Sequence, residues 1–538
     1  MDVTGTTFLF SSFLVLLLLL LGKQSYSRRG NARLPPGPFK LPLIGSLHHV
    51  LGRLPHRTFA ALSEKFGAVM LLKLGEVPTL VVSSPEAAAE IMKTQDVSFA
   101  SRPMISSIRI MGYGDKSPAF APYGSYWREV RKMSILELLS VRRVQSFRSI
   151  REEEVLNFVR SMDASANSGS TVNLSSKFLL LTNDIAARAI LGRKCKYQKQ
   201  FLQVTNQGLE ESGGFSLADL FPSSSLVSLL SGMSLKLPRL HREMDAILSS
   251  IIQEHREGNS TEQAEEDLVD VLLKVQREGS LPFAFTDEAV KAVVLVTFLT
   301  LISQIRFVPN FRCPTPGYLF WNGNLVKDLF GAGGETTATT LEWTMSELMT
   351  NPGAMKRVQE EVRETVGAKG RVREEDINEM NYLRMIIKET MRLHPPLPLL
   401  LPRECQEPRE ILGYQIPEKT RVLVNVWALG RDPRHWDDAA EFKPERFDRG
   451  SSTVDFKGTN FEFIPFGAGR RMCPGIAFGM ASVELPLACL LYHFDWELPA
   501  RDGGKPGELD MAENFSLTCR RRSELCLRAI PRNPCPMY

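Results

Sequence analysis

Apolar residues over much of the chain recur at spacings of three and four, the period of an amphipathic helix. This spacing predicts helices over four stretches: Ser125–Leu139, Asp287–Leu295, Leu325–Met349 and Glu375–Leu393. Short apolar runs rich in β-branched residues predict strands at Val69–Leu74, Thr79–Val82 and Arg421–Val426. Prolines end two of the helical patterns, because proline cannot continue a helix. The pattern predicts a body that is mainly α with a minor β region.

The N-terminus departs from this pattern. Residues 3–22 carry no charge, and Phe8–Leu21 is almost wholly apolar. A helix of this length matches the hydrocarbon core of a bilayer. Basic residues follow it directly, which keeps the rest of the chain cytosolic: Lys23, Arg28, Arg29 and Arg33. A cleaved signal peptide is the alternative, but a basic n-region and a small-residue cleavage site are missing ahead of the basic cluster. We therefore expect a single N-terminal transmembrane helix.

Three regions follow from these patterns. Residues 1–33 form the expected anchor with its basic flank, and residues 34–46 form a proline-rich hinge that begins Leu34-Pro35-Pro36-Gly37-Pro38. Residues 47–538 read as one large domain without a repeat. Within the body, residues 296–327 form an atypical insertion, described below.

Composition narrows the choice of function. The 538 residues carry 65 basic and 61 acidic side chains, a balance that argues against a nucleic-acid partner. None of the eight cysteines forms a CxxC pair, so neither a disulfide framework nor a zinc cluster is indicated.

One cysteine lies in a segment that carries specific chemistry, Phe466-Gly467-Ala468-Gly469-Arg470-Arg471-Met472-Cys473-Pro474-Gly475. Three glycines this close to a cysteine indicate a backbone that turns tightly against a flat object. A thiolate iron ligand needs such a loop, with N–H groups aimed at the sulfur and an arginine for a carboxylate at the macrocycle edge. The alternative is a glycine-rich loop with an ordinary cysteine. The segment closely resembles the haem-binding loop of the cytochromes P450. Three further motifs resemble those of the large plant groups that modify specialised metabolites: Phe120-Ala121-Pro122-Tyr123-Gly124, Arg392-Leu393-His394-Pro395-Pro396 and Pro444-Glu445-Arg446-Phe447.

The resemblance implies a cytochrome P450 fold, haem b as cofactor and Cys473 as the axial ligand of its iron. It implies cofactor-binding roles for further residues: Trp127, Arg131, Arg403, Phe466, Arg471 and Gly475. Trp127 and Arg131 stand at i and i+4, so they share a helix face. The resemblance also implies a buried structural triad of Glu389, Arg392 and Arg446. Without it, Glu389 and Arg392 at i and i+3 would read as a surface ion pair.

Oxygen activation is expected in Gly331-Ala332-Gly333-Gly334-Glu335-Thr336-Thr337. Each glycine weakens a helix by about 1 kcal/mol relative to alanine, so glycines in a predicted helix need an explanation. A helix that opens locally beside bound dioxygen would provide one. The resemblance makes Thr336 the hydroxyl on the oxygen side and Glu335 the acid that relays protons. A glycine-weakened core helix is the alternative.

The insertion departs from the family pattern. Relatives run from a segment like Lys291–Leu295 directly into one like Asp328–Gly333, whereas here residues 296–327 intervene and contain Pro309, Pro314 and Pro316. We hypothesise a translated, unspliced intron, because valine codons begin GT and a lysine codon can end AG, matching Val296 and Lys327. A lineage-specific loop is the alternative. We expect the chain as written to fold poorly or to be inactive.

The expected function is a membrane-anchored monooxygenase that oxidises a hydrophobic small molecule of plant specialised metabolism with O₂. No dinucleotide fingerprint follows a strand, so electrons from NADPH must arrive through a separate protein, NADPH–cytochrome P450 reductase. The resemblance places the protein on the endoplasmic reticulum membrane with a cytosolic catalytic domain. Two alternatives stay open: an inactive product of an intron-retaining or decaying gene, and a haem-thiolate isomerase or dehydratase. His394 is interpreted as a structural residue at a helix end.

Overall fold

The computed structural model describes residues 33–114, 116–167, 169–192, 217–257, 266–301, 334–448, 450, 453–499, 508–515 and 518–533. The predicted membrane anchor, the glycines at 331 and 333, and most of the 296–327 insertion lie outside these residues. The described part is mainly helical with small sheets, as the sequence pattern predicted.

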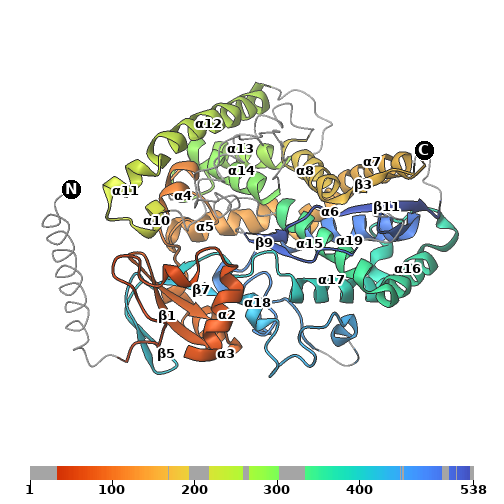
Figure 1. Ribbon diagram of the computed structural model, residues 1–538. Helices are drawn as coiled ribbons and strands as arrows, with labels where there is room; N and C mark the ends of the chain where they lie inside the picture. Colours follow the sequence, from red (N-terminus) through yellow and green to blue (C-terminus); the bar gives the residue numbers. More distant parts are fainter. Residues whose placement is uncertain are drawn as a thin grey trace, which may run out of the picture.

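The sheet-rich part lies to one side of the molecule (Figure 1). Its main sheet has the order β1-β2-β7-β4, with β1 antiparallel to β2 and β2 parallel to β7. Its elements, with the helices beside them, are β1 (Val69–Leu74), β2 (Val77–Val82), β4 (Arg403–Glu404), β7 (Arg421–Val424), α2 (Pro55–Phe66), α3 (Pro85–Ala89) and α18 (Val426–Leu429). A separate hairpin pairs β5 (Arg409–Ile411) with β6 (Tyr414–Ile416).

Helices make up the rest of the molecule (Figure 1). Those of the first half are α4 (Ser106–Met111), α5 (Ser125–Met133), α6 (Val141–Ser146), α7 (Arg148–Asn167), α8 (Leu174–Leu191), α10 (Leu217–Leu220), α11 (Ser225–Leu230), α12 (Met233–Glu257), α13 (Leu268–Glu278) and α14 (Asp287–Leu301). Those of the second half are α15 (Gly334–Thr350), α16 (Pro352–Val366), α17 (Asn381–Leu393) and α19 (Ile476–His493). Local signals set their ends: Asp267 caps α13, and Gly279 follows it in the left-handed conformation.

Two small sheets hold the C-terminal part. β11 (Cys526–Pro531) lies between β3 (Thr171–Asn173) and β8 (Phe494–Glu497), and β9 (Glu513–Phe515) pairs with β10 (Cys519–Arg521). The β9–β10 hairpin packs against α15, where Trp343 Nε1 donates to the backbone oxygen of Cys519 at 2.9 Å. The C-terminal strands therefore reach the central helix.

Several expected boundaries differ from those observed. The helix expected over Ser125–Leu139 is α5 followed by a π-helical turn at Ser134–Leu138. The helix expected from Glu375 is divided at Met380, with a 3-10 turn before α17. The strand expected to reach Val426 ends at Val424, because Asn425 caps α18 with its side chain. Amphipathic spacing alone does not reveal such local breaks.

The proline-rich segment expected as a hinge lies against β1. Leu71 N donates to Pro36 O at 2.9 Å, and Gly45 forms a bridge with Leu74. A Cβ at Gly37 would come within 2.3 Å of Leu71 O, so glycine is required by this close approach. From Pro36 onward the segment is therefore part of the folded body.

Among the described residues, α19 is the one helix long and apolar enough to cross a bilayer. In this structure 67% of it is buried, and it packs against α15, α16 and α7. Its apolar composition is therefore that of a helix buried in the protein core.

Candidate functional site

A cavity of about 250 Å³ lies at the centre of the molecule, between α15, α19, the end of α5 and the segment before β4. Its walls combine apolar side chains, several arginines and one cysteine. The residues that matter below are Arg102, Arg131, Thr336, Thr337, Thr340, Leu397, Leu400, Leu401, Arg403, Phe466, Arg471, Cys473 and Gly475. The cavity therefore gathers most of the site residues expected from the sequence.

The cysteine loop forms one wall of this cavity. Gly467 and Gly469 adopt φ values of +71° and +67°, which L side chains rarely adopt. At Gly469 a Cβ would meet Met92 O at 2.1 Å, so glycine lets the loop approach this backbone. The turn closes where Cys473 N donates to Phe466 O at 3.0 Å.

The sulfur of Cys473 lies in the cavity wall. Burial raises the pKa of its thiol, while the N–H of Gly475 and the charge of Arg131 act in the opposite direction. A donor aimed at the sulfur stabilises a thiolate, the form that binds iron. The loop can therefore present a soft anionic ligand in an otherwise apolar setting.

Four arginines lie around the same cavity: Arg102, Arg131, Arg403 and Arg471. Arg403 pairs with Asp96 at 2.8 Å, a buried carboxylate that also accepts from Arg470 N at 2.7 Å. The other three donate to backbone oxygens, as in the 2.7 Å bond from Arg102 to Leu401 O. Of these four guanidinium groups, that of Arg403 forms an ion pair with a carboxylate among the described residues.

The excess of positive charge around the cavity lowers the pKa values of two of these arginines. Burial and the neighbouring Arg471, Arg403 and Arg131 hold the pKa of Arg102 well below its usual range. Burial together with Arg403 and Arg131 lowers the pKa of Arg471 to about 9. Buried cations are tolerated when anions pair with them, so the cavity has the charge to receive a dianionic group.

One buried donor supports the same conclusion. Arg471 Nη1 has no hydrogen-bond partner among the described residues, although the other two nitrogens of this side chain donate to Ala100 O and Ala121 O. An unpaired buried N–H is costly and indicates a missing acceptor. The two propionates of a haem fit these arginine donors, and the haem iron would face the sulfur of Cys473.

Trp127 is placed differently from the other cofactor residues expected in the sequence. Its Nε1 donates to Pro118 O at 2.9 Å, and its ring lies 4.1 Å from the guanidinium carbon of Arg471. It is absent from the cavity lining. In this structure Trp127 supports Arg471 by stacking.

Helix α15 presents threonines to the cavity. Thr336, Thr337 and Thr340 line it, and Thr340 Oγ1 donates to Thr336 O at 2.8 Å. Glu335 is buried but does not line this cavity; its carboxylate accepts a hydrogen bond from Thr518 Oγ1 and forms an ion pair with Arg520 Nε, each at 2.5 Å, and both partners belong to the β9–β10 hairpin. The structure brings Thr336 to the site and turns Glu335 to another face of the helix.

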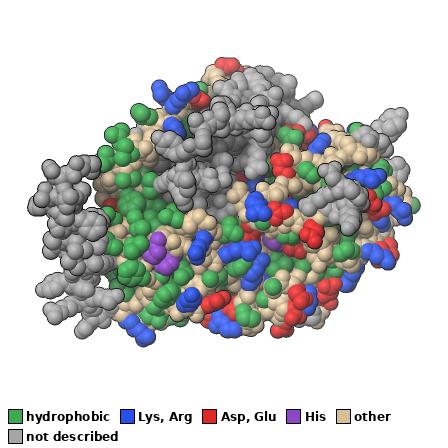
Figure 2. Space-filling view, viewed as in Figure 1, with side chains coloured by type: hydrophobic (Ala, Val, Ile, Leu, Met, Phe, Trp, Pro, Cys, Tyr) green, Lys and Arg blue, Asp and Glu red, His purple; other side chains and the backbone are tan. Residues whose placement is uncertain are grey.

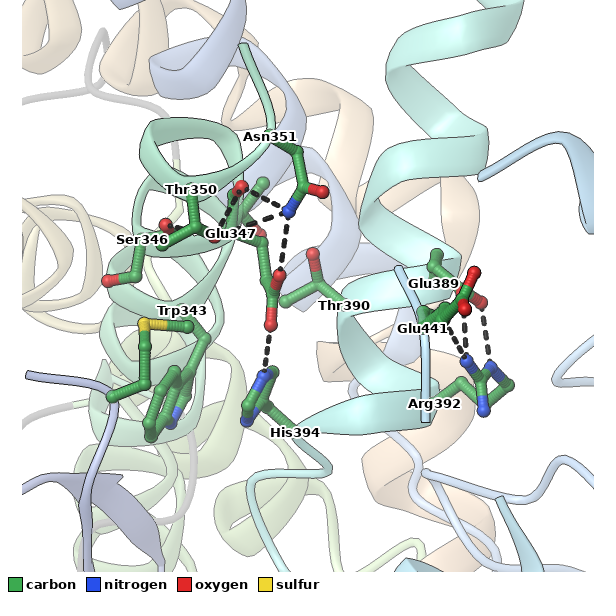
Figure 3. Close-up of polar contacts among 12 residues, drawn as sticks. Trp343, Ser346, Glu347, Thr350, Asn351, Glu389, Thr390, Arg392, His394 and Glu441 are labelled. Atoms are coloured by element: carbon green, nitrogen blue, oxygen red, sulfur yellow. Dashed lines mark hydrogen bonds and ion pairs between the residues drawn. The ribbon is translucent and has the colours of Figure 1, made fainter. Parts of the chain in front are cut away.

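The three residues expected as a structural triad lie together and are absent from the cavity lining; Figure 3 shows Glu389 and Arg392 of this group. Arg392 Nε and Nη2 bind the two oxygens of Glu389 at 2.7 and 2.8 Å, and Arg446 Nε binds Glu389 at 3.0 Å. Arg392 also donates to Gly430 O and Ala439 O. This network ties the end of α17 to the loop that precedes the cysteine segment.

His394 follows α17 and binds Glu347 of α15 at 2.6 Å (Figure 3). Its ring stacks on Trp343, with centroids 4.0 Å apart and 5° between the planes. Burial lowers the pKa of His394, although Glu347 opposes the change. The histidine joins two core helices and is absent from the cavity lining.

Two charged residues of the site were missed in the sequence. Arg102 lines the cavity and Asp96 neutralises Arg403, yet neither stands in the glycine-rich loop or in the Trp127/Arg131 helix. The available signal was weak: a lone arginine before Pro103 and a lone aspartate six residues earlier. Only the fold brings them to the same wall.

Comparison with known proteins decides the family. A family profile described as Cytochrome P450 matches residues 35–300 and 324–519. The chain belongs to this family. The match passes over residues 301–323, which fall within the segment expected to be an insertion.

Plant proteins match this P450 over nearly its whole length. The chain is 48% identical over 523 residues to desmethyl-deoxy-podophyllotoxin synthase of Sinopodophyllum hexandrum, which covers 96% of this chain and 95% of that protein. It is 45% identical to premnaspirodiene oxygenase of Hyoscyamus muticus and 43% identical to germacrene A hydroxylase of Barnadesia spinosa, with 98% of each chain covered in both cases.

Solved structures agree with the fold. A zebra fish cytochrome P450 solved with abiraterone superimposes with a TM-score of 0.69 at 25% identity, covering 89% of this chain and 99% of that chain. The protein is therefore a haem-thiolate monooxygenase of the P450 family, whose relatives act in plant specialised metabolism. The resemblance seen in the sequence is confirmed.

Proposed function

We propose that Cys473 is the axial ligand of the haem iron and that Arg102, Arg131, Arg403 and Arg471 hold the two propionates. The observation that carries this proposal is a cysteine sulfur in the wall of a cavity lined by four arginines, of which Arg403 is paired with a carboxylate, that of Asp96. When bound, haem supplies the activation of O₂ from which one oxygen atom enters the substrate. Phe466 and Gly475 line the cavity beside the sulfur and shape its surface.

The residues of the chain would position the substrate and move protons. Thr336 presents a hydroxyl to the cavity and is the proposed donor on the oxygen side. Glu335 is adjacent in sequence and is the proposed acid behind it. Glu389, Arg392 and Arg446 have a structural role in this proposal, since their network lies outside the cavity.

The substrate we propose is a hydrophobic plant metabolite, a terpenoid, phenolic or indolic compound. Apolar residues make up much of the cavity lining, among them Ala119, Pro396, Leu397, Leu400 and Leu401. The names of two relatives, premnaspirodiene oxygenase and germacrene A hydroxylase, support the terpenoid class. Product profiling after co-expression with a reductase would identify the compound.

We propose that the protein is anchored in the endoplasmic reticulum membrane by its N-terminal helix and receives electrons from NADPH–cytochrome P450 reductase. The membrane proposal is supported by exposed leucines of α11 and of the start of α12, of which Leu226, Leu229, Leu230 and Leu235 are 63–77% exposed. Figure 2 shows hydrophobic atoms gathered on the same side of the molecule as α11 and α10. Exposed basic residues near α5, including Arg128, Lys132 and Arg142, offer a surface for an acidic partner.

We also propose that residues 296–327 are an insertion in the distal helix of the catalytic domain, which otherwise spans residues 47–538. Helix α14 runs six residues into this segment, to Leu301, and α15 begins after it at Gly334; both helices pack on α8. The gap of the family match at residues 301–323 supports this reading.

Replacing the cysteine tests the proposed ligand. In Cys473→Ala we expect the reduced carbon-monoxide difference spectrum to lose the band of thiolate-ligated haem, because Cys473 is the one cysteine among the described residues that line the cavity. Cys405→Ala is the matched control, a buried cysteine whose sulfur bonds to Glu407 O outside the cavity. An unchanged spectrum in Cys473→Ala would refute the assignment.

A further inference from the structure

Two faces of α15 meet two different cavities. Thr336 and Thr340 line the haem cavity, whereas Thr339 and Glu342 line a second, smaller cavity of about 60 Å³. The residues that line this second cavity belong to α15, the start of α8 and the C-terminal hairpin with the loop after it. Its lining is polar for the most part: Ser175, Ser176, Leu179, Ala338, Thr339, Glu342, Asn514, Arg520, Arg521 and Glu524.

Glu335 is linked to the second cavity through Arg520. Arg520 Nε lies 2.5 Å from Glu335 Oε1, and the same arginine lines the second cavity. Thr518 Oγ1 donates to the same carboxylate oxygen at 2.5 Å. The carboxyl is therefore paired with an arginine of the second cavity, while Thr336, the next residue in the sequence, lines the haem cavity.

The second cavity contains polar atoms that the protein leaves without partners. Thr339 is 1% exposed, and its Oγ1 has no hydrogen-bond partner among the described residues; the same holds for Arg520 Nη2. Polar atoms buried around a cavity of this size are normally satisfied by ordered water. The chamber is therefore built to hold water next to Arg520.

A buried carboxyl borders this chamber. Glu342 is 6% exposed and accepts a hydrogen bond from Ser175 Oγ, which in turn accepts from Leu525 N at 2.8 Å. Burial raises the pKa of Glu342, against the opposing effects of Ser175, Arg520 and Arg521. A carboxyl of this kind keeps its proton to higher pH and can pass it on.

We propose that the second cavity is the proton-entry site for oxygen reduction, with Glu342 as proton carrier and Arg520 as the positioning residue that holds Glu335 toward it. This rests on the function proposed above. A proton moves from the Glu342 carboxyl through cavity water to the Glu335 carboxylate, and Glu342 takes another from solvent on the side of Glu524. No electrons move in these steps. Protonation of Glu335 removes one charge of its pair with Arg520, which frees the acid to turn toward Thr336.

The proposal can be tested without a known substrate by measuring how much of the consumed O₂ is released as hydrogen peroxide. The full chain is supplied with NADPH and a P450 reductase, and hydrogen peroxide release is compared with O₂ consumption. We expect Thr339→Val, which removes the water-binding hydroxyl at nearly constant volume, to raise the peroxide share by at least about twofold. Arg520→Gln and Glu342→Gln should do the same. The control is Arg522→Gln, a neighbouring arginine that is 66% exposed and pairs with Asp510.

A second measurement does not depend on turnover. The infrared spectrum of the resting protein near neutral pH should contain a protonated carboxyl band that disappears in Glu342→Gln and shifts in Thr339→Val, because the latter loses the water beside it. Absence of that band, or an unchanged peroxide share in Thr339→Val and Arg520→Gln, overturns the proton-entry site. A wild-type chain without reductase-dependent O₂ consumption overturns the proposed function instead, and the infrared result still decides whether Glu342 stores a proton.

Discussion

At the scale of single residues, buried charges in this P450 connect segments far apart in the chain. Glu513 of β9 accepts from Arg57 Nε at 2.7 Å and lies 3.0 Å from His56 Nε2, both on α2. Burial would raise the pKa of Glu513, but the hydrogen bonds and charges of His56 and Arg57 outweigh it and lower that pKa to about 2. Burial lowers the pKa of His56, so its neutral ring can donate to the carboxylate.

The ionised Glu513 therefore stabilises the fold above the pKa of an unfolded glutamate, about 4.3, and this contribution disappears as the pH falls toward 2. We expect Glu513→Gln to lower the free energy of unfolding near neutral pH by on the order of 2 kcal/mol. The difference from wild type should shrink as the pH falls below about 4.3. Thermal unfolding midpoints across this range measure it. Glu497→Gln, an exposed glutamate paired with Arg528, should change little at either end.

At the scale of elements, α15 is the part of the molecule on which the site depends most. One face carries the threonines of the haem cavity, another meets the C-terminal hairpin, and the helix also packs against α8, α17 and α19. A helix with so many fixed contacts tolerates little displacement. The proposed insertion at residues 296–327 stands shortly before α15 in the chain, so we expect it to disturb the contacts that position Thr336.

We predict that removing the inserted segment improves the protein. Deletion of residues 296–327 should raise the fraction of purified chain that carries haem, since α14 could then continue directly toward α15. Deletion of residues 301–323, the gap of the family match, tests the alternative borders. Haem content and the thermal midpoint are the measurements. If the undeleted chain equals both shortened forms in haem content and turnover, the segment is a tolerated loop.

At the scale of the whole molecule, exposed apolar side chains are concentrated where the N-terminal segment and α10–α11 meet. Glu76 N donates to Leu220 O at 2.8 Å, and Leu220 shares a core cluster with Leu47 and Val50. Phe39 and Leu43 of the N-terminal segment are 67% and 77% exposed. Apolar patches of this kind mark a contact surface, and we assign it to the membrane.

We predict that a chain starting at residue 34 still binds lipid vesicles through this surface. Replacing Leu226, Leu229 and Leu230 with serine should weaken vesicle binding by at least about tenfold, given the free energy of burying a leucine. Flotation with vesicles measures the bound fraction. The matched control replaces Leu136 and Val141, which are 55% and 64% exposed near α6. Equal loss in both variants would mean that the surface has no special affinity for lipid.

The sequence by itself determined the features that depend on residues close together in the chain. Strand β1 lies where its apolar run predicted, and the cysteine loop, the pair Trp127 and Arg131, and the pair Glu389 and Arg392 were recognisable from spacing and resemblance. Helix period, proline position and glycine at positive φ are local properties, so one sequence reveals them.

Only the tertiary structure decided which distant residues meet. Arg102 and Asp96 join the arginine wall, Glu335 turns from the haem cavity toward Arg520, and Trp127 supports an arginine by stacking. Arg520 follows Glu335 by 185 positions along the chain, as their numbers show. No pattern along the chain encodes such a contact, because burial and charge pairing are settled by which surfaces pack together.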